Sequence, residues 1–379
     1  MRILHVNMSL DPVTGGGTAE RTLQLARQLA HLRHDCTILT IACGVARPYS
    51  SDDRSDYLNI VRLPCFNQRF YIPKFKASEI LRLVDDADIT HLMGHWTFLN
   101  ALVFRYAQHL KKPYVVCPAG ALPIFGRSRI LKHAYNALVG RRLVRKARAH
   151  VAIADNELPQ YAEYGIRPDH ITKIPNGVNL QDYQQFDVGL FRSRAGLGTA
   201  PYILFVGRLN LIKGPDILLN AFRETVPVHP ECHLVFAGPD GGMETSLRGM
   251  AEEMGVQDRV HFIGYVGGAE KTSAYRGASF VVVPSRQEAM SIVVLEAGIC
   301  GKAVLISDLC GFSASDRIEG IHVVSSTEAG IRDGLLDLLH DSGQTNEMGE
   351  RLKQYVEENY TWELMARRYV SLFQEVLQH

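Results

Sequence analysis

Short apolar runs alternate along the chain with longer segments in which apolar residues recur at helical spacing. This alternation is typical of parallel sheets covered on both faces by helices. It continues along most of the 379 residues, a length that allows two domains with separate cores. The pattern therefore predicts an α/β protein with two doubly wound, Rossmann-like domains that face an interdomain cleft.

The apolar runs place the strands, and a polar stretch after PNGVNL places the domain boundary. The clearest helical period lies in residues 20–32, and the C-terminal stretch indicates helices separated near Asn359. We expect a first domain over 1–180, a linker over 181–200, a second domain over 201–358 and a C-terminal helix over 359–379. Strands are expected at 3–8, 36–42, 60–63, 89–93, 114–117, 151–154, 171–174, 202–206, 233–237, 259–263, 280–283, 303–306 and 321–324.

Composition indicates a folded, soluble protein, because 46% hydrophobic and 21% charged residues are close to globular averages. The 41 Lys and Arg residues balance 40 Asp and Glu residues, so no net field favours nucleic acid as a partner. The seven cysteines form no C-x-x-C pair and are expected to be buried, reduced thiols. MRILHVNMSL predicts a buried strand rather than a signal peptide, and no apolar run approaches the roughly 20 residues that cross a bilayer. We expect a cytoplasmic protein.

Two carboxylates flank a predicted helix start that follows the strand at 280–283. Glu288 lies in the loop before the helix, Ser291 can cap its first turn, and Glu296 lies within it. Free N–H groups and the positive end of the helix dipole make such a start a phosphate site. Carboxylates beside it suit hydrogen bonds from sugar hydroxyls, so the segment indicates a ligand with both sugar and phosphate. Taken alone, Glu296 fits an exposed helix carboxylate better.

Two basic residues follow the strand at 202–206, in the segment GRLNLIKG. Arg208 and Lys213, at the carboxyl end of a strand, can neutralise a diphosphate, both in the ground state and as a leaving group gains charge. Gly207 and Gly214 permit close backbone approach at both ends of this loop. A solvated basic loop is the alternative interpretation.

A third phosphate candidate lies in the first half, where Gly15, Gly16 and Gly17 stand between the first strand and a helix. Glycines at such a turn let backbone N–H groups touch phosphate. The segment lacks the G-x-x-x-x-G-K-[ST] pattern, and Glu20 stands where the dinucleotide pattern G-x-G-x-x-G needs glycine. A flexible turn is the competing interpretation.

Taken in order, GGG, PNGVN, FVGRLNLIKG and the spacing E-x7-E in EAMSIVVLEA resemble the retaining glycosyltransferases of the GT-B fold, family 4 (group 1). The resemblance covers nearly the whole chain, and YTWELMARRY resembles the helix by which these proteins cross back onto their first domain. It implies an acceptor-side domain over 1–180 and a nucleotide-sugar-binding domain over 201–358. The implied enzyme is a hexosyltransferase (EC 2.4 class) that moves a hexose-type sugar from a nucleotide diphosphate sugar to a glycan or lipid-linked acceptor. This activity would serve the assembly of cell-surface polysaccharide or glycoconjugate.

The resemblance also implies roles for individual residues. Arg208 and Lys213 would hold the donor diphosphate, and Glu288 would bind hydroxyls of the transferred sugar, so that these three form the expected catalytic set. Glu296 would bind the ribose. No metal or other cofactor is expected, because the basic pair and the helix start neutralise the phosphates, and no residue stands out as nucleophile or base. The other implied donor contacts are Gly16, Gly17, Met290, Ser291, Ile292, Gly238, Tyr265 and Val266.

One position departs from the family pattern. Many relatives carry a P-H-G-type turn, whose histidine reaches the donor sugar, where this chain has CPAGAL. Ala119 stands in the place of that histidine, and a methyl group cannot hydrogen-bond. His91 and His95, in THLMGHWTF, lie near a neighbouring strand end and are candidates for a polar group in the cleft. A histidine in such a place is more often structural.

The segment 126–150 carries eight Arg or Lys residues and no Asp or Glu. Its apolar residues recur at helical spacing, so it can lie on an anionic membrane surface, where each basic residue adds about 1 kcal/mol. This favours a peripheral enzyme on the inner face of the membrane that acts on a lipid-linked acceptor. A core-packed helix with a solvated basic face is the alternative. The apolar residues are Ile130, Leu131, Ala134, Tyr135, Leu138 and Val139.

Two other functions fit parts of the pattern. A nucleotide-sugar epimerase of the same fold needs a donor site but no acceptor. A non-catalytic nucleotide-sugar-binding protein would account for Ala119. The presence of Arg208, Lys213, Glu288 and Glu296 together argues against the non-catalytic protein.

Overall fold

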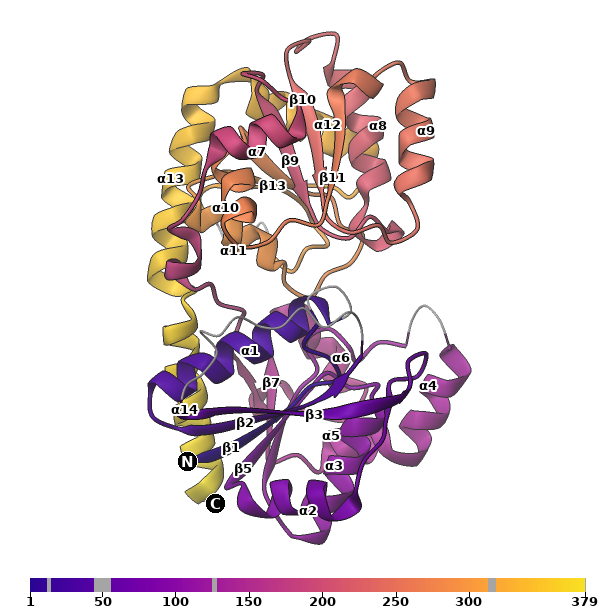
Figure 1. The fold of residues 1–379 in the computed structure, drawn as a ribbon, viewed down its shortest axis with the longest axis vertical. Coiled ribbons are helices and arrows are strands. Elements are labelled where there is room, and N and C mark those ends of the chain that lie inside the picture. Colours follow the sequence, from indigo (N-terminus) through magenta and orange to yellow (C-terminus); the bar gives the residue numbers. More distant parts are fainter. Residues whose placement is uncertain (12–14, 44–55, 125–127, 313–317, 379) are drawn as a thin grey trace. The chain divides into compact units, whose positions relative to one another are not determined.

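The computed structural model describes residues 1–11, 15–43, 56–124, 128–312 and 318–378. The chain divides into two units, one of Met1–Gly177 with Trp362–His379 and the other of Val178–Thr361. In each unit helices cover a sheet whose strands are almost all parallel, as Figure 1 shows. The predicted fold class, two α/β domains, is confirmed.

The sheet of the first unit has the order β4-β3-β2-β1-β5-β6-β7-β8. All neighbours pair in parallel except β3 and β4. The pattern did not predict β4, because two residues carry no periodicity. The strands are β1 (Arg2–Val6), β2 (Asp35–Ala42), β3 (Leu58–Asn67), β4 (Ile72–Pro73), β5 (Ile89–Met93), β6 (Tyr114–Cys117), β7 (Ala149–Ala152) and β8 (Ile171–Lys173).

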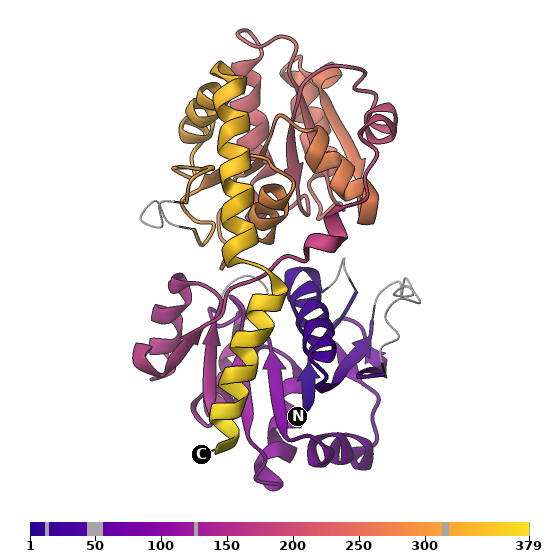
Figure 2. The ribbon, with the colours of Figure 1, turned by 90° about the vertical axis from the view of Figure 1, so that its left-hand side faces the viewer.

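One helix of the first unit comes from the far end of the sequence. α14 lies beside α1 on the sheet (Figure 2) and buries Trp362, Tyr369 and Phe373. The helices of this unit are α1 (Gly16–His31), α2 (Ala77–Asp86), α3 (Phe98–His109), α4 (Arg129–Tyr135), the π-helical η2 (Asn136–Gly140), α5 (Arg141–Arg145), η3 (Asp155–Glu157), α6 (Leu158–Ala162), η4 (Pro168–His170) and α14 (Trp362–Gln378).

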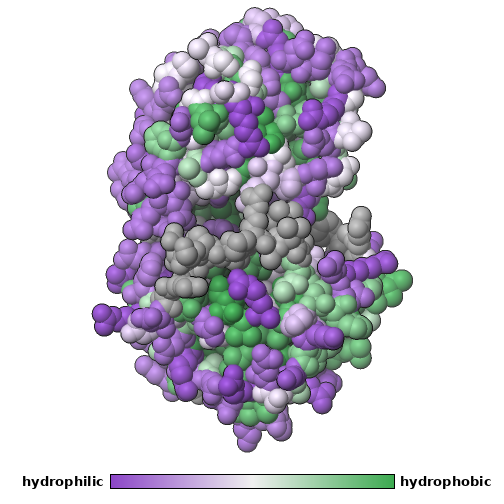
Figure 3. Space-filling view, in the orientation of Figure 1, coloured by the Kyte–Doolittle hydropathy of each residue, from purple (hydrophilic) through white to green (hydrophobic). Residues whose placement is uncertain are grey.

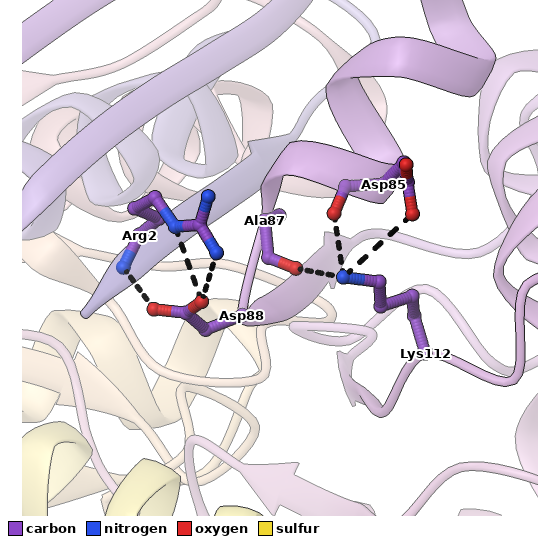
Figure 4. Close-up of polar contacts among 5 residues, drawn as sticks. All are labelled: Arg2, Asp85, Ala87, Asp88 and Lys112. Atoms are coloured by element: carbon purple, nitrogen blue, oxygen red, sulfur yellow. Dashed lines mark hydrogen bonds and ion pairs between the residues drawn. The ribbon is translucent and has the colours of Figure 1, made fainter.

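Polar contacts pin the amino ends of the central strands (Figure 4). Arg2, at the start of β1, donates to Asp88 from Nη2 at 2.7 Å and from its backbone N–H at 2.8 Å. Lys112 donates to the carbonyls of Asp85 and Ala87 at 2.5 and 3.2 Å. These contacts are largely exposed, and exposed ion pairs contribute only about 0–1 kcal/mol. The burial of β1, β5 and β6 between helices therefore stabilises this unit more than these exposed polar contacts do.

The sheet of the second unit is fully parallel, with the order β11-β10-β9-β12-β13-β14. Its strands are β9 (Tyr202–Val206), β10 (His233–Ala237), β11 (Val260–Gly264), β12 (Phe280–Val283), β13 (Val304–Ser307) and β14 (Ile321–Val324). Its helices are η5 (Leu180–Tyr183), α7 (Val188–Ala195), η6 (Leu211–Lys213), α8 (Pro215–Thr225), α9 (Glu244–Glu253), η7 (Gln257–Arg259), α10 (Gly268–Gly277), α11 (Ile292–Ile299), α12 (Glu328–His340) and α13 (Ser342–Asn359).

The segment 181–200, expected as a linker, instead holds most of η5 and all of α7 and belongs to the second unit. α7 buries only Phe191 and Ala195 against that unit, and so few apolar positions gave no visible helical period. The chain passes from the first unit to the second between Gly177 and Val178, and returns between Thr361 and Trp362. In the described ranges, no helix combines the length and the apolar character that spanning a membrane requires.

Candidate functional site

The loop after β9 brings a basic residue against the loop after β12. Asn210 accepts a hydrogen bond from the backbone N–H of Lys213 and so caps η6. Gly214 then adopts a φ of +68°, and a Cβ at this position would lie 2.2 Å from the carbonyl oxygen of Pro284. Glycine is required here both by the backbone conformation and by the close approach. This turn sets Lys213 beside the residues that follow β12.

Lys213 and Glu288 form an ion pair in the second unit. The Lys213 Nζ lies 2.5 Å from Glu288 Oε1, which also accepts from Ser285 Oγ at 2.6 Å. The Glu288 side chain is 10% exposed and that of Lys213 is 32% exposed, so a ligand can reach the pair more easily from the lysine side. The two residues stand 75 positions apart, yet β9 and β12 are neighbours in the sheet. The structure thus joins two of the three residues expected to be catalytic.

The loop that carries Glu288 is held by the segment that follows β13 (Val304–Ser307). The backbone N–H groups of Glu288 and Ser291 donate to the carbonyls of Leu309 and Cys310 at 2.9 and 3.3 Å. Gly311, with φ +75°, makes this possible, since a Cβ there would lie 1.7 Å from the carbonyl oxygen of Ala289. Glu288 is therefore held by backbone contacts as well as by its own side chain.

The start of α11 has the features of an anion site. Ser291 is the N-cap residue, 1% exposed, and its Oγ has no hydrogen-bond partner among the described residues. Ile292 opens the helix, and the first N–H groups of a helix lack partners within it. These groups and the helix dipole favour a negative charge at this place. Met290 and Ser291 are buried and Ile292 is half-buried.

Glu296 is buried on α11 and satisfied by three donors. Its Oε1 accepts from Tyr183 OH at 2.9 Å and from Lys271 Nζ at 2.7 Å, and its Oε2 accepts from Tyr275 OH at 2.7 Å. Burial would raise the pKa of Glu296, but Lys271 and the two hydroxyls lower it below its ordinary value. The carboxylate is therefore ionised, and the interpretation of Glu296 as an exposed helix carboxylate is wrong.

Sequence reasoning missed the three partners of Glu296. Tyr183 lies in η5, while Lys271 and Tyr275 lie on α10. The positions of the tyrosines are ordinary core positions, and a single lysine on a helix is usually solvated, so no local signal distinguishes them. Only the packing of α10 and η5 against α11 brings them to this carboxylate.

The remaining donor-site candidates of the second unit also follow strand ends. Arg208 is half-buried and follows β9 after one residue. Gly238 follows β10, and its N–H donates to the carbonyl of Gly264 at 2.7 Å. After β11 come Tyr265, 37% exposed, and Val266, 5% exposed. Because β11, β10, β9 and β12 are consecutive in the sheet, all these candidates share one edge.

In the first unit, Gly16 and Gly17 form the first turn of α1, and Gly16 has a φ of +55°. Residues 12–14 of the preceding loop lie outside the described ranges. The N–H of Gly15 donates to the carbonyl of Asp11 at 2.7 Å. Among the described residues, a Cβ on Gly16 would meet no atom within 4 Å apart from its chain neighbours and the backbone of its own helix.

The two candidate histidines do not form a polar surface. His91 lies within β5, fully buried, with its Nδ1 3.1 Å from that of His5 and its ring against Tyr369 of α14. The hypothesis that His91 offers a polar group to a ligand is therefore wrong. His95 follows β5, is 1% exposed, and contacts Asn136 Oδ1 at 3.0 Å through Nε2. Burial lowers the pKa of His95 to about 4, so this ring is neutral near pH 7.

Ala119, two residues after the end of β6, adopts a φ of +50° that is uncommon for residues other than glycine. The following N–H, of Gly120, donates to Glu157 Oε1 at 2.5 Å, and the N–H of Ile153 donates to Oε2 at 2.6 Å. Glu157 is 0% exposed, and burial raises its pKa. Sequence reasoning missed this residue, which holds the turn that contains Ala119.

The basic segment is described from residue 128 onward, so Gly126 and Arg127 lie outside the described ranges. α4 has no buried residue; Ile130 is 84% exposed and, beyond it, Leu138 on η2 is 76% exposed. Hydrophobic side chains gather at the right-hand side of Figure 3, where Figure 1 labels α4. The alternative of a core-packed helix is therefore wrong for α4, although Leu143 and Val144 of α5 are buried.

Solved structures of low sequence identity share this fold. The structure of Anabaena HepE in complex with UDP and glucose superposes with a TM-score of 0.81 at 16% identity, over 99% of this chain and 100% of that one. Sucrose-phosphate synthase from Thermosynechococcus elongatus gives a TM-score of 0.78 at 20% identity, over 100% and 99% of the two chains. The chain thus has the GT-B fold of glycosyltransferases.

Two family models match the chain, "Glycosyltransferase Family 4" over residues 15–182 and "Glycosyl transferases group 1" over residues 190–358. The chain belongs to this family, the family 4 (group 1) glycosyltransferases, which are transferases of the EC 2.4 class. A D-inositol 3-phosphate glycosyltransferase from Segniliparus rotundus is 33% identical over 47% of this chain and 40% of its own length. One from Frankia alni is 27% identical over 89% of each chain. The match spans less than half the length of the first of these relatives.

Proposed function

We propose that this protein is a retaining glycosyltransferase that moves a hexose-type sugar from a nucleotide diphosphate sugar to a glycan or lipid-linked acceptor. The observation that carries the proposal is the Lys213–Glu288 ion pair beside the uncapped start of α11. At one edge of the sheet, the lysine and the helix start suit the negatively charged diphosphate of such a donor, and the carboxylate suits its sugar hydroxyls. A role in assembling cell-surface polysaccharide or glycoconjugate is part of the proposal.

In this proposal the ion pair is the resting form of the site. Lys213 turns from Glu288 toward the incoming diphosphate, which Arg208 also holds, and Glu288 then accepts hydrogen bonds from sugar hydroxyls. The cations then stabilise the charge that develops on the leaving diphosphate. Gly16 and Gly17 contribute backbone N–H groups from the first unit.

Glu296 binds the ribose through the lone pair of its carboxylate that its three hydrogen-bond donors do not use. An ionised carboxylate has about four lone-pair sites, and Tyr183, Lys271 and Tyr275 use three. These partners hold the carboxylate in one orientation before the nucleotide arrives, which reduces the cost of ordering it on binding. Tyr265 and Val266 flank the base.

A thermal-shift screen against UDP-, GDP-, dTDP- and ADP-sugars tests the donor site, because a ligand that binds only the native state raises the melting temperature. The UDP-glucose complex of HepE makes the UDP-sugars the first to test. We expect Lys213→Ala to keep the fold but to lose most of the shift, measured from the melting temperature of the ligand-free variant. Lys353→Ala, which removes a lysine of α13 that is as exposed as Lys213, is the matched control. A full shift in Lys213→Ala would refute the assignment.

Metal independence and retained stereochemistry are further parts of the proposal. The cationic side chains and the helix start do the work that a divalent ion does elsewhere. Transfer in the presence of EDTA should therefore match transfer without it, and NMR of the first product should show the anomeric configuration of the donor. Inhibition by EDTA that added Mg²⁺ reverses, or an inverted product, would contradict these two statements.

The same assays separate the proposal from its alternatives. An epimerase would convert the donor sugar with no acceptor present, and a non-catalytic protein would bind a donor without turning it over. A transferase releases nucleoside diphosphate in proportion to the acceptor supplied. The match with family 4 glycosyltransferases favours the transferase.

We also propose that α4 and η2 rest on an anionic membrane surface at its inner face, where a lipid-linked acceptor is found. Exposed Ile130 and Leu138 can enter the interface, while neighbouring arginines and lysines each add about 1 kcal/mol. Wild type should sediment with phosphatidylglycerol vesicles at low salt, and Ile130→Asp should not. Leu190→Asp, at a 71% exposed leucine of α7, is the control. Equal sedimentation of both variants would refute this surface.

A further inference from the structure

A buried arginine of α1 holds the segment by which the chain leaves the first unit. Arg21 is 1% exposed. Its Nη1 donates to the carbonyl of Pro175 and to Asn176 Oδ1, each at 2.8 Å. Its Nη2 donates to the carbonyl of Ile174, also at 2.8 Å. The contacts thus end one residue before Gly177, the last residue of this unit before the chain crosses.

The same guanidinium holds the segment by which the chain returns. Nη2 also donates to Tyr369 OH at 2.9 Å, and the guanidinium carbon lies 5.6 Å from the centre of the Trp362 ring. Trp362 is the first residue after the return crossing and opens α14. One side chain therefore fastens both crossing segments to α1, the helix that begins at Gly16.

In the second unit the two crossing segments are tied directly to each other. The N–H of Val178 donates to the carbonyl of Tyr360 at 2.7 Å, and Val178 pairs with Thr361 as an isolated parallel bridge. Arg21 thus holds the outgoing segment as far as Asn176 and the returning segment from Trp362 onward. Between these residues, Val178 holds the two segments together.

Stability alone does not explain a charge at this position. A guanidinium is costly to bury unless its donors are satisfied, and an apolar side chain of similar volume often stabilises a core as well or better. The planar fork of arginine differs from such a side chain in fixing the directions of several acceptors at once. The contacts of Arg21 use that property on two segments 186 positions apart, from Asn176 to Trp362.

We infer that Arg21 is a positioning residue for the transfer reaction, because it fixes the Gly16–Gly17 end of α1 to both chain crossings. The inference rests on the proposed function. Donor affinity comes mainly from Arg208, Lys213 and Glu288 in the second unit, whereas transfer also needs the first-unit glycines in a fixed place. Loss of the Arg21 contacts therefore lowers kcat more than it weakens donor binding.

The test is Arg21→Lys, which keeps the charge but not the fork. We expect kcat to fall by about tenfold or more, since small misplacements of reacting groups are costly. Donor Kd, measured by calorimetry, should stay within about twofold of wild type. Arg27→Lys, half-exposed on the same helix, is the control and should keep wild-type kcat. An unchanged kcat, or equal losses in kcat and donor affinity, would overturn the inference.

Tyr369→Phe removes one contact of Arg21 and carries the test if Arg21→Lys does not fold, with a smaller fall in kcat expected. Hydrogen exchange gives a readout that needs no activity: amides of the 176–178 and 360–362 segments should exchange faster in Arg21→Lys and Tyr369→Phe, but not in Arg27→Lys. Unchanged exchange in both variants would refute the role of Arg21 and would leave the proposed function untouched. A wild type that transfers no sugar from any donor, yet shows faster exchange in these variants, would instead refute the proposed function.

Discussion

Neutral buried histidines make the stability of the first unit depend on pH. His5 and His91 face each other on β1 and β5, both 0% exposed, and His95 is 1% exposed. Burial lowers the pKa of His5 to about 3 and that of His95 to about 4, and it also lowers the pKa of His91. In the unfolded chain these groups regain a pKa near 6.5.

Between about pH 6.5 and pH 4 the unfolded state therefore binds protons that the native state does not, so stability falls as the pH falls. The slope approaches about 1.4 kcal/mol per pH unit for each histidine, or about 2 kcal/mol between pH 7 and pH 5. His5 and His95 together predict a loss of about 4 kcal/mol over this interval, a large part of the free energy of unfolding of an ordinary domain.

Tryptophan fluorescence during urea unfolding measures this effect in the first unit alone, because both tryptophans, Trp96 and Trp362, lie there. We expect His5→Gln to reduce the difference in stability between pH 7 and pH 5 by about 2 kcal/mol relative to wild type. The raised pKa of Glu157 acts in the opposite direction, but it is common to both proteins and cancels. His31→Gln, at an exposed position, is the control. Equal pH dependence in wild type and His5→Gln would refute the reasoning.

Three further substitutions test local features. Glu296→Gln should destabilise the second unit by about 2 kcal/mol. This is less than the roughly 3–5 kcal/mol for breaking a fully buried ion pair, because Lys271 is a quarter exposed. An unchanged urea midpoint for the unfolding of the second unit would contradict this. Gly214→Ala should destabilise by more than about 1 kcal/mol through its positive φ and the clash that a Cβ would make, whereas Gly249→Ala, inside α9 with open space around it, should stabilise by about 0.5–1 kcal/mol. Thermal melts compare the two. Ala119→Gly should stabilise the first unit by about 1 kcal/mol by relieving its positive φ; a lower melting temperature would argue that the methyl group packs favourably.

All the strands except β4 were predictable, because each contains a local apolar run. Strands β5, β6, β9, β10, β12 and β14 begin and end at the predicted residues. The placement of Lys213 and Glu288 in one site was also expected, since both follow strands of one parallel sheet and such strand ends share an edge, whereas the ion pair between them was not predicted. For the same reason the family motifs were recognisable without a structure, because each is a short run of residues at a strand end.

The polar partners of these motifs were decided by tertiary structure. Tyr183 stands 113 positions from Glu296, and Arg21 stands 348 positions from Tyr369. The burial of His91 was also decided by tertiary structure, because nothing in the sequence of its strand indicates that α14 covers it. Sequence periodicity reports which face of an element is buried, but not which distant element covers that face. The sequence alone thus determined two largely parallel sheets and the residues at the carboxyl ends of their strands. The packing of helices from distant parts of the chain determined which charges are buried and which residues hold them.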